Sequence, residues 1–119
     1  MIQKRWNKIS LNENLADFLK ILADPTRLDI LNILKDGKER TTTEIHEILD
    51  LSQPAISQQL KKLENVDLLK ARRESRKKYY KIKDPQIFRI LTLLNLYMSN
   101  ISKDKIEELA DIDILDTYY

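Results

Sequence analysis

The chain has 119 residues, 42% of them apolar and 34% charged, and this is the composition of one globular domain rather than of a disordered chain. It contains no cysteine, which excludes disulfides and thiolate metal sites formed by this chain. No segment has the roughly 18 consecutive apolar residues of a membrane helix, and the N-terminus lacks an apolar core of signal-peptide length. We therefore expect a cytoplasmic protein with no membrane partner.

The net charge of +2 hides an uneven distribution. Residues 53–83 contain ten Lys/Arg and three Asp/Glu, so this segment carries +7 while the remainder is mildly acidic. A solvated surface would also be charged, but here the cations follow directly on a helix with a polar outward face. The distribution indicates that one face of the protein meets a polyanion.

The N-terminal part predicts two helices. Leucines recur at helical spacing over residues 11–22, which is typical of a first helix. Asp24 can cap the second helix, and Pro25 suits its first position, where the missing N–H is harmless. We expect this second helix to end at Gly37 in a left-handed cap.

A short third helix follows the threonines of residues 41–43. Thr41 and Glu44 have the spacing of a capping box, in which each side chain bonds the other's backbone N–H. Ile45, Ile48 and Leu49 fall at helical spacing. We expect these three residues to form the buried stripe of this helix.

The fourth helix has distinct inner and outer faces. Ser52 is its expected cap, and its inward seam consists of Ile56, Leu60 and Leu63. At ~100° per residue the opposite face is polar. It carries Pro54, Ser57, Gln58 and Lys61, with Lys62 beside them.

Residues 66–83 change character and predict a β-hairpin. Leu68-Leu69 and residues 79–82 suit strands, and the polar residues 73–77 suit the turn between them. A long last helix begins near Pro85, and its apolar stripe over residues 87–101 is wider than one neighbour would cover. The predicted fold is mainly α with a small β-hairpin: a winged helix-turn-helix, dimeric, with residues 1–119 as a single domain.

This arrangement fits double-stranded DNA. An α-helix fits the major groove, and glutamine presents a donor and an acceptor together to a base edge. Ser57 can bond a base edge or a phosphate, and Lys61 and Lys62 suit phosphates, which fix the register of the protein on the duplex. The hairpin cations would reach the flanking backbone or the minor groove, with Arg76 the best candidate for insertion. These cations are Arg72, Arg73, Arg76, Lys77 and Lys78.

Three segments together resemble a known family. DPTRLDILNIL, TTTEIHEILDLSQPAISQQLKKLENVDLL and ARRESRKKYYKI are similar, in order and spacing, to the ArsR/SmtB-type transcriptional repressors over residues 15–100. The resemblance implies a homodimer that binds operator DNA and is released by a metal ion or another signal. It adds Ser52 and Gln53 to the expected DNA contacts and assigns the first and last helices to the dimer interface. The interface residues that we predict are Leu15, Phe18, Leu22, Ile87, Ile90, Leu94, Tyr97, Met98 and Ile101.

The sequence also departs from the family. Its metal sensors often carry a Cys-x-Cys motif on the helix before the recognition helix, or histidines on the last helix, and this chain has neither. Ser75 stands in the hairpin where many relatives carry glycine. His46, the only histidine, is more typical of a solvent-edge residue than of a ligand, and the acidic C-terminal segment is more typical of a solubilising tail. We expect no metal site and no cofactor.

The function that this sequence predicts is that of a sequence-specific DNA-binding transcriptional regulator, a homodimeric repressor that binds an imperfect inverted repeat. No nucleophile–base pair or phosphate loop is visible, so we do not expect an enzyme. A non-specific architectural DNA-binding protein is one alternative, and Gln53 and Gln58 argue against it. A winged-helix protein-interaction module is another, and the +7 segment argues against that.

Overall fold

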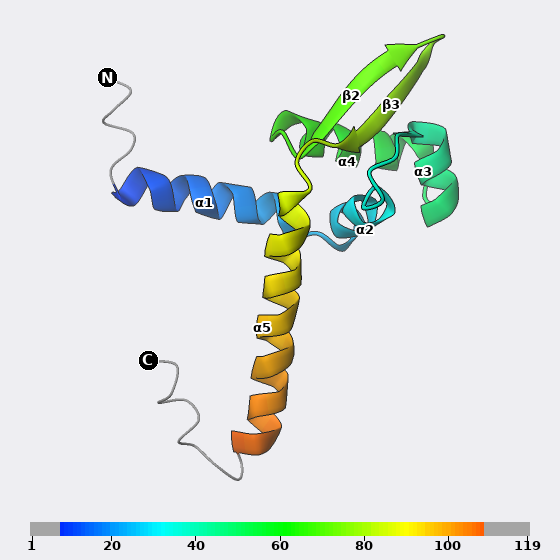
Figure 1. Ribbon diagram of the computed structural model, residues 1–119. Coiled ribbons are helices and arrows are strands. Elements are labelled where there is room, and N and C mark those ends of the chain that lie inside the picture. Colours follow the sequence, from blue (N-terminus) through cyan, green and yellow to red (C-terminus); the bar gives the residue numbers. More distant parts are fainter. Residues whose placement is uncertain (1–7, 109–119) are drawn as a thin grey trace. The chain divides into compact units, whose positions relative to one another are not determined.

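The computed structural model describes the backbone of residues 8–108 and the side chains of residues 11–101. The chain divides into two compact units, one ending at Pro85 and the other beginning at Gln86. In the first unit the elements are, in order, α1 (Lys8–Leu22), α2 (Pro25–Ile33), β1 (Arg40–Thr41), α3 (Thr42–Leu49), α4 (Gln53–Asn65), β2 (Leu69–Glu74) and β3 (Lys77–Ile82) (Figure 1). The second unit contains α5 (Gln86–Glu108). The predicted winged helix-turn-helix is confirmed, and within residues 8–108 no helix is long and apolar enough to cross a membrane.

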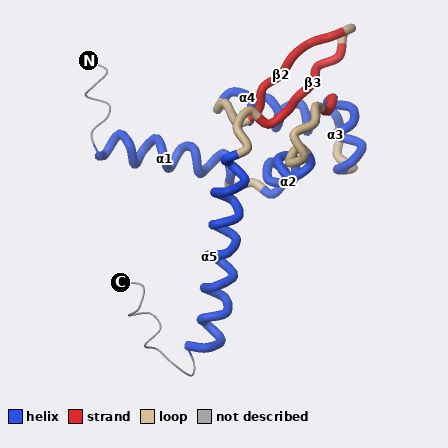
Figure 2. The backbone as a smooth tube through the Cα atoms, in the orientation of Figure 1, coloured by secondary structure: helices blue, strands red, loops and turns tan. Residues whose placement is uncertain are grey.

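The hairpin of β2 and β3 is longer than predicted (Figure 2). It belongs to a sheet of three antiparallel strands, in the order β1-β3-β2. Glu74 pairs with Lys77, so only Ser75 and Arg76 form the turn. The predicted turn over residues 73–77 was therefore too wide, because Arg73, Glu74 and Lys77 remain paired within the two strands. Strand β1 was not predicted, since two polar residues carry no alternation that a sequence pattern could show.

The helix starts follow their predicted caps. The Asp24 carboxylate accepts a hydrogen bond from the N–H of Arg27 at 3.0 Å, and the Ser52 hydroxyl accepts one from the N–H of Ala55 at 3.2 Å. Thr41 and Glu44 form the expected capping box, with reciprocal side-chain to backbone bonds of 3.1 and 2.8 Å. Each of these caps satisfies N–H groups that have no partner inside the helix. The local signals thus set where α2, α3 and α4 begin.

The end of α2 differs from the prediction. The helix ends at Ile33 with Leu34 as its cap, and Gly37 lies beyond it in the loop. Gly37 does have the expected positive φ of 81°, a conformation that glycine adopts without strain. The glycine therefore shapes the loop between α2 and β1 rather than the cap itself.

The core of the first unit lies between the helices and the inner side of the sheet. The α4 seam of Ile56, Leu60 and Leu63 is fully buried, as predicted. In α3 only Ile45 is fully buried; Leu49 is half-buried and Ile48 is 55% exposed, so the expected stripe was wrong in part. A helix of two turns can bury little more than one line of side chains, and Ile48 lies ~60° from Ile45 on the helix. The other buried apolar residues of this unit are Leu22, Ile30, Leu31, Leu34, Leu68, Leu69, Tyr80 and Ile82.

Helix α5 shows large apolar side chains along most of its described length. Leu93, Leu96, Tyr97 and Met98 are each more than half exposed. Exposed apolar side chains that follow one another along a helix often mark an interaction surface.

Candidate nucleic-acid interface

The outward face of α4 is exposed and polar, as its sequence predicts. Ser57 and Gln58 in the middle of this face are both exposed, while the seam on the opposite side holds the helix against the core. The Ser52 hydroxyl caps α4 by accepting a hydrogen bond from the Ala55 N–H. Its own O–H can still donate to a ligand. The remaining predicted contacts on this helix, Gln53, Pro54, Lys61 and Lys62, are exposed as well.

The sheet register divides the hairpin cations between two faces. Residues that pair directly across antiparallel strands share a face, and the faces alternate along each strand. Arg73 pairs with Lys78, and the next pair on the same face contains the buried Tyr80. Arg72 pairs with Tyr79 on the other face. We call the Arg73–Lys78 side the groove face.

An open groove runs between the groove face and α4. Ser57 and Lys61 of α4 line it on one side, and Arg73 and Lys78 line it on the other. Helix α4 and the groove face therefore present their polar and basic side chains to the same space. A duplex or its phosphate backbone placed there would meet both elements.

Lys78 fastens the hairpin to α4. Its ammonium lies 3.0 Å from the Glu64 carboxylate and 5.1 Å from the centre of the Tyr80 ring. The hydrogen bond to Glu64 raises the pKa of the Lys78 ammonium above its ordinary value. Half-buried and paired, Lys78 carries a charge that is already balanced within the protein.

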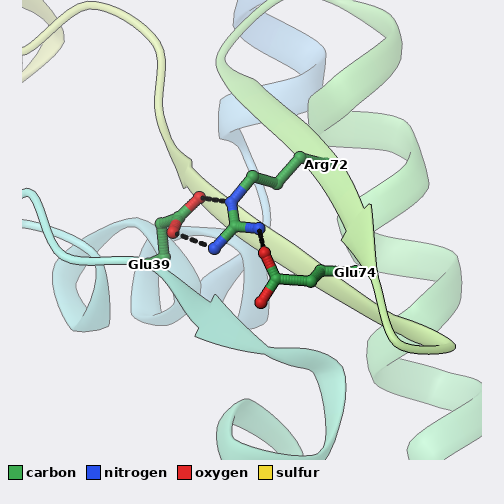
Figure 3. A network of polar contacts seen from close by, with 3 residues as sticks. All are labelled: Glu39, Arg72 and Glu74. Carbon is green, nitrogen blue, oxygen red and sulfur yellow. Dashed lines mark hydrogen bonds and ion pairs between the residues drawn. The ribbon is translucent and has the colours of Figure 1, made fainter.

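Arg72 is held on the opposite face by two carboxylates (Figure 3). Its Nε and Nη2 donate to the two Glu39 oxygens at 2.7 and 2.8 Å, and its Nη1 donates to Glu74 at 2.8 Å. The guanidinium also lies 4.5 Å from the centre of the Tyr79 ring. The hydrogen bond from Arg72 lowers the pKa of Glu39, and the bonds to Glu39 and Glu74 raise the pKa of Arg72. The pair ties the wing, by which we mean β2, β3 and their turn, to the loop before β1.

The three remaining hairpin cations are differently placed. Arg73, Arg76 and Lys77 are exposed, and within residues 11–101 no carboxylate forms an ion pair with any of them. Arg76 sits at the tip, where Ser75 and Arg76 have φ of 50° and 68°. Two successive positive φ values are typical of a type I′ turn, which favours Asn-Gly, so the tip stores strain. Strained backbone of this kind is often found at functional sites.

The residues predicted for a dimer interface fall into two groups. Leu22 and Ile87 are buried in the single chain, and Phe18 is half-buried. The others are exposed and lie on α1 and α5: Leu15, Ile90, Leu94, Tyr97, Met98 and Ile101.

His46 lies near the turn between α3 and α4. Its Nδ1 is 3.2 Å from the carbonyl oxygen of Leu51, which is a local contact within the turn. In the part of the chain that the structure describes, no three His, Asp or Glu side chains gather into a group that could hold a metal ion.

Sequence reasoning missed the partner of Arg72. Glu39 lies 33 residues away in the chain, in a loop without a motif, and only the pairing of β1 with β3 brings it to Arg72. An isolated glutamate in a loop gives no signal that could have identified it.

A winged helix-turn-helix with a polar helix face and a basic hairpin defines a class of DNA-binding proteins. The comparisons with known proteins specify the class further. The family described as "Bacterial regulatory protein, arsR family" matches residues 24–71. Over 83 residues the chain is 40% identical to the transcriptional repressor PagR of Bacillus anthracis, a match that covers 70% of this chain and 83% of PagR.

Two solved structures are similar over most of the chain. The Rv0081 protein of M. tuberculosis is 29% identical with a TM-score of 0.72, covering 81% of this chain and 96% of that one. A homodimeric winged helix-turn-helix DNA-binding domain of Mycobacterium bovis, described as a possible ArsR-family regulator, is 30% identical with a TM-score of 0.68, covering 79% and 86%. The chain belongs to the ArsR family of bacterial regulatory proteins. It is a winged helix-turn-helix, DNA-binding transcriptional regulator.

Proposed function

We propose that this chain acts as a homodimeric repressor that binds an imperfect inverted repeat in double-stranded DNA through α4 and the wing. The observation that carries the proposal is the groove in which Ser57 and Lys61 of α4 face Arg73 of the wing. The names of its relatives support it, since PagR is a transcriptional repressor and the M. bovis domain is homodimeric and DNA-binding. A DNA-bound role places the protein in the cytoplasm, and we propose no catalytic activity for it.

In this proposal α4 enters the major groove and supplies the base contacts. Gln58 is at the centre of the exposed face and can bond a base edge with both its donor and its acceptor. Gln53 and Ser57 lie beside it, and Lys61 and Lys62 neutralise phosphates. These contacts would give the sequence preference of the protein.

The wing contacts the DNA backbone, and we propose that its five cations divide into two groups with different roles. Arg73 on the groove face, Arg76 at the tip and Lys77 beside it contact phosphate or the minor groove. Arg72 and Lys78 hold the wing in place, because each has carboxylate partners that a phosphate would have to displace. A phosphate contact by Arg72 or Lys78 would come at the loss of an ion pair already formed within the protein, so it would gain less than a contact by an unpaired cation.

Helices α1 and α5 form the proposed dimer interface. Their exposed apolar residues include Leu15 on α1 and Leu94, Tyr97 and Met98 on α5. A two-fold dimer covers the same patch on both subunits. It also presents two copies of α4 to half-sites about 34 Å apart, one turn of DNA, which is why we propose an inverted repeat.

The test is the binding of selected and scrambled DNA. Duplexes that the wild-type protein enriches from a random pool would be compared with scrambled duplexes of the same composition at two salt concentrations. We expect the selected duplex to bind at least about 1,000-fold more tightly, the lower end for specific recognition, and to contain two related half-sites. Equal affinity for both duplexes would favour an architectural protein, and binding to neither would favour a protein-interaction module.

A further inference from the structure

Arg27 in α2 contacts two other helices with one side chain. Its Nε donates to the Oε1 atom of Gln59 in α4 at 2.7 Å. Its Nη1 donates to the carbonyl oxygens of Ile21 at 2.9 Å and Lys20 at 3.3 Å, both in the last turn of α1. Arg27 is half-buried, and its bonds to Gln59 and Ile21 are partly shielded from water, whereas its bond to Lys20 is exposed. One planar group thus joins the end of α1 to α4.

The contact with α1 follows from the chemistry of a helix end. The last four carbonyl groups of a helix have no partner within it, and the aligned peptide dipoles make that end partly negative. A guanidinium satisfies both needs, since it donates hydrogen bonds and carries positive charge. The position of Arg27 is itself fixed, because its backbone N–H donates to the Asp24 cap of α2. Any movement of the end of α1 therefore acts directly on the Arg27 side chain.

The contact with α4 reaches the proposed base-contacting face. Gln59 is half-buried on the flank of α4, between the seam residue Leu60 and the exposed Gln58. The 2.7 Å bond is short for an N–H donor and has a charged partner, which makes it stronger than a neutral hydrogen bond. Losing this bond would release one flank of α4 directly beside Gln58.

We propose that Arg27 is a positioning residue that couples the end of α1 to the DNA-contacting helix α4. The proposal rests on the proposed function, in which α1 lies in the dimer interface and α4 lies on DNA. A change at the dimer interface that shifts the end of α1 alters the affinity for DNA through Arg27 and Gln59. Coupling is reciprocal, so DNA bound to α4 must also change the stability of the last turn of α1.

Two variants interrupt the link at different points. Gln59→Met removes the acceptor on α4, keeps a similar volume and leaves the guanidinium on the end of α1. Arg27→Lys keeps the charge, but a single ammonium does not span both partners as the guanidinium fork does. Arg40→Lys is the matched control, because Arg40 also bonds a helix-end carbonyl, that of Ile33, and pairs with Asp36, without a bond to α4. Thermal unfolding of all variants shows whether each one folds.

The measurement is affinity for the selected duplex and for its scrambled counterpart. We expect Gln59→Met and Arg27→Lys each to lose roughly tenfold on the selected duplex, the scale of one hydrogen bond to a charged group, and less than about twofold on scrambled DNA. The double variant should lose no more than either single one, because both remove the same link. The control should keep both affinities. Three results would overturn the proposal. The double variant could lose the product of the two single losses, the affinity could fall equally on both duplexes, or Gln59→Met could bind the selected duplex like the wild type.

Hydrogen exchange gives a second readout that a purely structural role would not move. The amides of Ala23 and Asp24 bond back to Lys20 and Leu22 at the end of α1. We expect the selected duplex to change their exchange at least about threefold in the wild type and not in Gln59→Met; the same change in both would contradict the coupling. If the wild type does not discriminate between duplexes, the proposed function fails and the coupling with it. If the wild type discriminates and the two variants do so equally well, only the coupling fails.

Discussion

Helix α4 and the wing both present cations and polar groups beside one groove, but different rules decide which of their residues are available. On α4 the helical period alone separates the buried seam from the exposed face, and Gln58 lies where that period puts it. On the wing, Arg72 and Arg73 are adjacent in sequence and carry the same charge, yet they point to opposite faces of the sheet. Glu39 forms an ion pair with Arg72. Helical spacing alone therefore predicts which residues of α4 are exposed, whereas on the wing the sheet register and the ion-pair partners must be known as well.

The largest expected effect concerns the inner side of α4. Leu60 is fully buried, so Leu60→Ala should lower the free energy of unfolding by about 2–5 kcal/mol, because apolar burial is reduced and a cavity remains. Lys61→Ala on the adjacent exposed position should change it by less than about 0.5 kcal/mol. Urea unfolding measures both. Similar decreases for the two variants would mean that α4 has no distinct inner and outer faces.

The next effect concerns the outer side of α4. Gln58→Ala should weaken binding to the selected duplex by ~1–3 kcal/mol, the scale of one bidentate hydrogen-bonded pair with a base. Binding to scrambled DNA should change little, because glutamine has no charge to neutralise a phosphate. Fluorescence anisotropy with both duplexes checks this. An equal weakening on the two would show that Gln58 binds the backbone rather than bases.

A smaller effect concerns the Glu39–Arg72 pair of the wing. The bond from Arg72 keeps the pKa of Glu39 below its ordinary value of 4.5, so the folded protein binds that proton less readily than the unfolded chain. The stabilisation is therefore present above pH 4.5 and is lost as the pH falls through the lowered pKa. Unfolding temperatures of the wild type and Glu39→Gln should differ at about pH 6 and converge towards about pH 3. A difference that stays constant or grows on acidification would show that the pair does not stabilise the wing.

The smallest effect concerns the turn of the wing. Ser75 has a positive φ in a turn type that favours asparagine at this position. Ser75→Asn should raise the free energy of unfolding by roughly 0.5 kcal/mol by relieving backbone strain. The side chain is exposed and uncharged, so the salt dependence of DNA binding should not change. Destabilisation by this substitution would show that the tip is not the strained type I′ turn.

Short-range signals predicted much of this molecule. The caps at Asp24, Thr41 and Ser52 each depend on a partner three residues away, and the α4 seam depends on the period of one helix. Such signals lie entirely within one stretch of sequence. The order of the five helices and the hairpin, the winged helix-turn-helix and the exposed face of α4 followed from them.

Long-range pairing decided what could not be predicted. The bonds from Arg72 to Glu39 and from Arg27 to Gln59 join residues 33 and 32 positions apart. Strand β1 has two residues and exists only because β3 lies beside it. The exposure of Ile48 likewise depends on what packs against α3 rather than on the spacing within it. None of these partners can be inferred from composition or period.

We propose that sheet register, and not charge alone, decides which wing cations bind DNA. The most direct test compares Arg72→Ala and Arg73→Ala by the slope of log K against log salt concentration on the selected duplex. A variant that no longer neutralises one phosphate should show a slope reduced by about 0.9. We predict this reduction for Arg73→Ala and an unchanged slope for Arg72→Ala, even if the latter binds more weakly because the wing is less firmly held. Equal reductions in the two variants, or a reduction in Arg72→Ala alone, would contradict the claim.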